Sequence, residues 1–120
     1  MEFELYAVRV FVENWDRSIE FYENTLELEC VFKDADMGWG QFKVGGSHLG
    51  IERVTDDSEM ASLVGRYVGI SLMVQDIDQA YEELVAKGVQ FTAPPEKQSW
   101  GGVFAHMQDP DGNVLTLLGQ

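Results

Sequence analysis

Cysteine is scarce in this chain of 120 residues, which carries only Cys30. A single thiol excludes an internal disulfide and leaves nothing for a zinc site built from cysteines. We expect Cys30 to be a buried structural residue, because free cysteine is among the residue types most often found in protein interiors.

Basic residues are also few. Eight Lys and Arg residues stand against 21 Asp and Glu residues, which gives a net charge of −13. A field of this sign repels phosphate backbones, so we expect no nucleic-acid partner. It attracts a cationic small molecule, and the alternative interpretation is that the charge serves solubility alone.

Long apolar runs are absent as well. No run of about 18 apolar residues occurs, so we expect neither a membrane-spanning helix nor a membrane partner. Residues 1–10 are acidic and lack the basic start and the apolar stretch of a secretory signal, which predicts a cytoplasmic protein. The length, with 45% hydrophobic residues, predicts one globular domain.

The clearest local pattern is the turn at 109–113, which reads Asp-Pro-Asp-Gly-Asn. Proline presets φ, glycine permits a positive φ, and the Asp and Asn side chains cap backbone groups. Extended runs flank the turn, so we expect a β-hairpin of residues 103–108 and 114–118. Leu115 belongs to its core face, whereas Thr116 is a lone polar residue on the other face.

Alternating and helical spacings predict the element order β-α-β-β-β in the first half of the chain. The Gly45-Gly46 pair is a hairpin signal between the last two strands. The expected elements are a strand at 5–12, a helix capped by Asn14 with a stripe that reaches Leu26, and strands at 29–33, 40–44 and 48–52.

The same order restarts after an acidic linker at 56–59 and a short helix expected within 60–66. Asp76 is the expected N-cap of a helix, with Gln79 at the capping-box spacing, and Gly88 is placed to end it. The remaining expected elements are strands at 68–74 and 89–92, a loop at 93–98, and the hairpin described above.

Residues 12–16 align with residues 74–78 at a constant offset of 62 positions. We therefore predict one domain made of two βαβββ modules, at about 1–54 and 67–120. Each helix needs one apolar sheet face to lie on. The opposite faces mix small, polar and charged residues, which is typical of a partly wet pocket rather than a core.

Three stretches in this duplicated frame carry a resemblance. They read NWDRSIEFY at 14–22, SWGG at 99–102 and DPDGN at 109–113. Together with the repeat, they resemble the vicinal oxygen chelate superfamily, which comprises the glyoxalase I, bleomycin-resistance and extradiol-dioxygenase group. The resemblance implies an α+β fold in which two βαβββ modules form an incomplete barrel around a pocket, commonly in homodimers.

The resemblance also implies where metal-dependent members place their ligands, which are usually His, Gln or Glu. Those positions fall on Ala7, Gly69 and Thr116, with the fourth near Gly50. None of these side chains anchors a divalent cation strongly, so we expect no metal and no other cofactor. A shifted site that uses His48 and Glu52 is the alternative.

Trp39 and Trp100 lie among glycines, which leaves an indole face open to a flat or cationic ligand; core packing is the alternative. Arg9 and Glu52 are expected to form an ion pair across the pocket floor, and binding of a polar ligand is the alternative. His106 is either a general base or a hydrogen-bonded histidine. The full set of candidate ligand-binding residues is Arg9, Trp39, Phe42, His48, Glu52, Trp100 and His106.

These observations predict metal-independent binding or sequestration of a small aromatic or cationic compound in a bleomycin-resistance-like protein. One alternative is a metal-dependent lyase or extradiol dioxygenase with an atypical site, so the sequence leaves enzymatic activity open. Another is an accessory module with a vestigial pocket. We also expect a homodimer, because an open sheet leaves strand edges that a second copy can cover.

Overall fold

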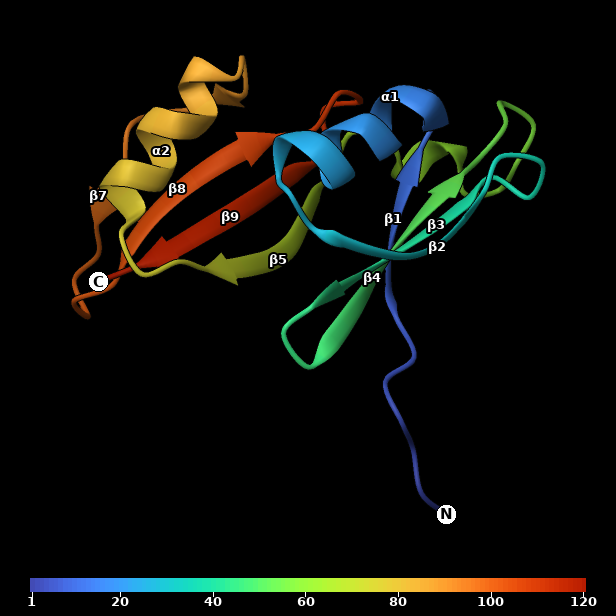
Figure 1. Ribbon diagram of the computed structural model, residues 1–120, viewed down its shortest axis with the longest axis horizontal. Helices are drawn as coiled ribbons and strands as arrows, with labels where there is room; N and C mark the ends of the chain where they lie inside the picture. The colour runs from blue at the N-terminus through green and yellow to red at the C-terminus, as the bar shows by residue number, and fades with distance from the viewer. The chain divides into compact units, whose positions relative to one another are not determined.

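The computed structural model describes residues 1–120, which form two compact units, 1–64 and 65–120 (Figure 1). Each unit contains one β-sheet and one α-helix, which confirms the predicted α+β class. Both units follow the order β-α-β-β-β, and the second inserts one extra two-residue strand. No helix is long and apolar enough to cross a membrane.

The first unit has a four-stranded sheet in the order β1-β4-β3-β2. Strands β1 and β4 are parallel, and the other neighbours are antiparallel. Its elements are β1 (Val8–Val12), α1 (Trp15–Glu20), a π-helical turn (Phe21–Thr25), β2 (Glu29–Asp34), β3 (Trp39–Val44), β4 (Ser47–Arg53) and a 3₁₀ turn (Ala61–Leu63).

The core of this unit lies between α1 and one face of the sheet. Asn14 caps the helix as predicted, because its side chain accepts a hydrogen bond from the Arg17 amide. The Trp15 indole then donates to the Ile51 carbonyl at 3.3 Å. Gly40 lies directly under the helix, since a Cβ there would lie 2.3 Å from the end of the Ile19 side chain. The helix therefore packs against this face and leaves the opposite face of the sheet available.

Three predicted secondary-structure elements in the first unit need correction. The first strand begins at Val8 rather than at residue 5, because its pairing with β4 starts at the register pair Val8 and Leu49. The helix is α-helical only to Glu20 and then widens into a π-helical turn, in which Tyr22 is fully buried. The short helix expected within 60–66 is a single 3₁₀ turn.

Cys30 is half-buried rather than buried. It lies on β2, where its thiol contacts the Phe32 carbonyl at 3.5 Å. Burial raises the pKa of this thiol, and the nearby negative charge of Glu23 raises it further. Cys30 is therefore held in the neutral thiol form, the less reactive one.

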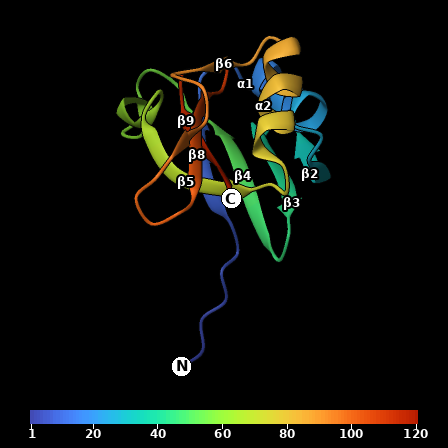
Figure 2. The ribbon, with the colours of Figure 1, turned by 90° about the vertical axis from the view of Figure 1, so that its left-hand side faces the viewer.

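The second unit has a sheet in the order β5-β9-β8-β6, with β7 paired to β8 beside this path. Strands β5 and β9 are parallel, like β1 and β4 in the first unit. Its elements are β5 (Tyr67–Met73), α2 (Ile77–Ala86), β6 (Gln90–Phe91), β7 (Glu96–Lys97), β8 (Val103–Gln108) and β9 (Val114–Gly119). Figure 2 shows α2 and these strands from a second side.

The ends of α2 follow the prediction. Asp76 accepts a hydrogen bond from the Gln79 amide, and the chain turns at Gly88 with φ of 91°. The capping box is only half formed, because the Gln79 side chain bonds Glu83 instead of returning to the cap. The predicted strand at 89–92 is shorter than expected, and the predicted loop at 93–98 contains β7.

The 109–113 turn joins β8 and β9 as predicted. The Asp109 carboxylate accepts hydrogen bonds from the amides of Asp111 and Asn113. The Asn113 side chain, fully buried, accepts from the amides of Gly65 and Arg66, directly before β5. One turn thus closes the hairpin and also fixes the start of β5, the parallel neighbour of β9.

Candidate functional site

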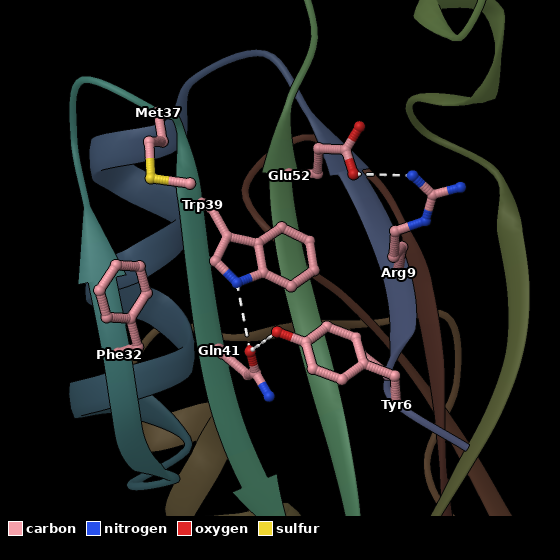
Figure 3. Close-up of a pocket in the computed structure, with 8 residues that line it drawn as sticks. Tyr6, Arg9, Phe32, Met37, Trp39, Gln41 and Glu52 are labelled. Carbon is pink, nitrogen blue, oxygen red and sulfur yellow. Dashed lines mark hydrogen bonds and ion pairs between the residues drawn. The ribbon is translucent and has the colours of Figure 1, made fainter. Parts of the chain in front are cut away.

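A pocket of about 640 Å³ lies in the first unit, on the sheet face opposite α1 (Figure 3). Trp39 and Gln41 point into it from β3, because they alternate with Gly40 and Phe42, which face the helix. The residues that line the pocket are Tyr6, Ala7, Arg9, Phe32, Met37, Trp39, Gln41 and Glu52.

The indole of Trp39 forms the floor of this pocket. Trp39 is the cross-strand partner of Glu52, and its ring lies over the backbone of Gly50. A Cβ at Gly50 would come within 2.1 Å of the indole, so only glycine allows this position. The indole nitrogen donates to the side-chain oxygen of Gln41 at 3.3 Å. The ring is therefore fixed at its edge and supported from beneath.

Gln41 organises the polar part of the floor. It is 7% exposed, and its side-chain oxygen also accepts a hydrogen bond from the Tyr6 hydroxyl at 3.0 Å. Its amide nitrogen contacts Nδ1 of His48. Because the amide group donates, Nδ1 of His48 is the acceptor and the ring proton is on Nε2. The buried amide thus has partners on both of its ends.

Arg9 and Glu52 form the ion pair that the sequence predicts. One guanidinium nitrogen lies 3.0 Å from one carboxylate oxygen of Glu52. The Arg9 side chain is 50% exposed, whereas that of Glu52 is 23% exposed. The guanidinium also lies over the ring of Phe11, 5.3 Å from its centroid. These are the only two charged residues that line the pocket.

A β-bulge brings Phe32 into the pocket. Cys30 pairs with Phe42, but Phe32 pairs with Gln41, so one extra residue is inserted in β2 between them. In a regular strand Cys30 and Phe32 would share a face. The bulge moves Phe32 to the face of Gln41, opposite that of Phe42, where its ring is 48% exposed.

Two of the predicted ligand-binding residues in this unit are not among those that line the pocket. Phe42 is fully buried and packs against Tyr22, 6.2 Å between ring centroids. Its assignment to a binding surface is wrong, because strand alternation places it on the helix-facing side. His48 contacts the pocket only through the amide of Gln41.

Trp100 and His106 belong to the second unit. The Trp100 indole lies over Gly102, is 63% exposed and borders a smaller pocket of about 330 Å³. His106 Nδ1 lies 2.9 Å from the Thr116 hydroxyl, which also meets the Tyr67 hydroxyl at 3.3 Å. His106 therefore has a hydrogen-bond partner on the neighbouring strand β9.

Five residues that line the larger pocket are not among the candidate ligand-binding residues, and one of them, Ala7, entered only as a position where the resemblance implies a metal ligand. Gln41 could have been found, because it stands two positions after Trp39 and so shares its strand face. Tyr6 and Met37 lie outside regular strands, where no periodicity assigns a face. The bulge hides Phe32 from any regular alternation.

The residues at the four positions implied by the resemblance do not fit a metal ion. Ala7, Gly50 and Gly69 offer no side-chain ligand, and the Thr116 hydroxyl is already bonded to His106 and Tyr67. No group of three or more His, Cys, Asp or Glu side chains is placed to hold a metal.

The positions of His48 and Glu52 do not favour the alternative site. The two residues are four positions apart on β4, a rise of about 13 Å in a strand, and each bonds a different partner. A metal ion needs its ligands within about 2 Å, so these two side chains do not share one.

The sequence and structure are similar to known proteins. The family model described as the Glyoxalase/Bleomycin resistance protein/Dioxygenase superfamily matches residues 5–117. A bleomycin resistance protein from Klebsiella pneumoniae is 30% identical, over 88% of this chain and 83% of its own length. The uncharacterized protein YraH of Bacillus subtilis is 28% identical, over 95% of this chain and 96% of its own length. A crystal structure of a member of the same superfamily from Sphaerobacter thermophilus has a TM-score of 0.83 and 30% identity, and covers 99% of this chain and 98% of that one.

Proposed function

We propose that this chain, which belongs to the Glyoxalase/Bleomycin resistance protein/Dioxygenase superfamily, binds a small aromatic cation in the pocket of its first unit without a metal ion. Binding of this kind sequesters the compound and requires no chemical step. The proposal keeps the prediction from sequence but moves its centre to the residues around Trp39.

The observation that carries the proposal is the indole of Trp39 on Gly50, directly opposite Glu52 on the neighbouring strand. A flat π-face beside a carboxylate matches a ligand that is itself flat and positively charged. The indole is held by Gln41, so little conformational entropy is lost when a ligand stacks on it. Phe32 and Tyr6 supply further aromatic surface around it.

Three other observations support the proposal. The pocket volume of about 640 Å³ lies in the range of small-molecule sites. The net charge of −13 favours the approach of cations. The relative from Klebsiella pneumoniae is named as a bleomycin resistance protein, and bleomycin resistance is consistent with capture of a small molecule.

Binding of N-methylacridinium, a permanently charged three-ring cation, tests the proposal. We expect calorimetry to show saturable binding that is weakened at least about fivefold by Trp39→Ala, because stacking of a flat ring on an aromatic side chain contributes about 1–3 kcal/mol. Trp100→Ala is the matched control, because it removes an exposed indole that does not line this pocket.

Dialysis against EDTA tests metal independence in the same assay. The affinity for N-methylacridinium should be unchanged after dialysis. A loss of binding that added zinc or manganese restores would contradict the proposal, as would binding that depends on Trp100 rather than on Trp39.

A further inference from the structure

We infer that Arg9 competes with the ligand for Glu52. A cationic ligand must displace the Arg9 guanidinium from the Glu52 carboxylate in order to bind. The inference rests on the proposed function and assigns a role to the one cationic residue of the pocket. Arg9 would then decide which compounds are held, because only a ligand that offers Glu52 a replacement cation compensates for the lost ion pair.

The contact between the two side chains is of the kind that breaks easily. A single pair of atoms lies at 3.0 Å, rather than the two parallel hydrogen bonds that arginine makes in its strongest pairs. Exposed ion pairs with one contact contribute little to stability, since water and salt screen them. The ion pair itself therefore costs little to break.

Arg9 and Glu52 differ in how well water hydrates their charged groups after the ion pair breaks. Half of the Arg9 side chain is already exposed, so the guanidinium is hydrated by a small movement outward. About three quarters of the Glu52 side chain is covered, so the carboxylate recovers less hydration. When Arg9 moves away, the Glu52 carboxylate is left partly buried without a counter-ion, which favours binding of another cation.

A cationic ligand on the floor of the pocket is well placed to replace Arg9 as the counter-ion of Glu52. Trp39 and Glu52 are directly opposite each other on β3 and β4, and Figure 3 shows the indole and the carboxylate side by side. Arg9 approaches the same carboxylate from β1, on the side away from the indole (Figure 3). The carboxylate thus stands between the internal cation and the position of a stacked ligand.

Binding of two matched probes to variants of this chain tests the inference. N-methylacridinium is charged, whereas acridine in mildly alkaline buffer has nearly the same shape and is neutral. We expect Arg9→Gln to tighten binding of N-methylacridinium by up to about fivefold, the upper end of the range that an exposed ion pair allows. Binding of acridine should be unchanged.

Three further variants separate competition from other effects. Lys43→Gln removes the same charge from β3 at an exposed residue that does not line the pocket, and it should leave both affinities unchanged. Glu52→Gln should weaken N-methylacridinium binding and cancel the gain from Arg9→Gln. Arg9→Lys should retain the competition. Thermal unfolding of each variant verifies that the fold is kept.

The outcomes distinguish this inference from the proposed function. If Arg9→Gln weakens N-methylacridinium binding as Glu52→Gln does, Arg9 positions the carboxylate and the inference is wrong while the proposed function stands. If Arg9→Gln tightens both probes, or Lys43→Gln equals Arg9→Gln, competition for Glu52 is also wrong. If no variant binds N-methylacridinium in a way that depends on Trp39, both are wrong.

Discussion

Substitution of Gly50 by alanine tests the arrangement on which the pocket depends. The added Cβ would lie 2.1 Å from one carbon of the Trp39 ring and 2.7 Å from two more. Contacts this short cannot persist, so the indole must leave the strand surface. It then loses its hydrogen bond to Gln41 and its packing on β4.

The magnitude follows from opposing terms. Replacing glycine by alanine within a strand normally stabilises by about 0.5–1 kcal/mol. Loss of the hydrogen bond to Gln41 costs about 0.5–1.5 kcal/mol, and strain from overpacking adds about 1–3 kcal/mol. These terms give a net loss of about 0.5–4 kcal/mol, so we expect Gly50→Ala to lower the free energy of unfolding by about 2 kcal/mol.

A double-mutant cycle with Trp39→Ala isolates the cause. Without the indole, the Cβ at position 50 meets no ring, so Gly50→Ala should be neutral or stabilising in that background. The coupling between the two positions should be about 2 kcal/mol, measured by urea denaturation followed by circular dichroism. Gly46→Ala is the control, because a Cβ there has no neighbour within 4 Å. Equal costs in both backgrounds would refute the reasoning.

Three more predictions concern the turn, the pH dependence of stability and assembly. Asn113→Ala should destabilise by about 2–3 kcal/mol in the same denaturation assay, because it removes a fully buried side chain that accepts from the amides of Gly65 and Arg66 and donates to the Asp109 carboxylate; exposed Asn24→Ala should change stability by less than about 0.5 kcal/mol. The hydrogen bond from Lys33 lowers the pKa of Glu23 below its usual 4.5. The stability that this contact adds to the folded state is therefore present above pH 4.5 and is lost as the pH falls through the lowered pKa. The melting temperatures of wild type and Lys33→Gln should converge in acid, and a constant difference would contradict this. Light scattering should give about twice the 13.5 kDa of one chain, and a mass of one chain would exclude the homodimer.

Several parts of the structure follow from local rules that act within a few residues. Asp76 and Gly88 bound α2 because their side-chain and backbone preferences act regardless of the rest of the fold. The same holds for the 109–113 turn. The pairing of Arg9 with Glu52 was predictable because strand alternation placed both on one face, where a charge requires a partner.

Other parts depend on irregularities that carry no periodic signal. The bulge after Cys30 reverses the face of Phe32, and a single extra residue in a strand leaves composition and spacing almost unchanged. The reach of Tyr6 to Gln41 depends on where β1 begins, and strand ends are poorly specified by sequence. The sequence therefore allowed the existence of a ligand-binding sheet face to be predicted, but only some of the residues that lie on it.

Trp39 shows how a local pattern and a structural requirement can differ. Its sequence neighbours Gly38 and Gly40 indicated an open indole face, yet the glycine that the ring requires is Gly50, on the next strand. Gly50 also lies near a position where the resemblance implies a metal ligand. Any side chain there would collide with the indole, so a ligand at position 50 and the flat indole exclude each other. A residue such as His at position 50 would supply an imidazole and remove the surface on which an aromatic cation is proposed to stack.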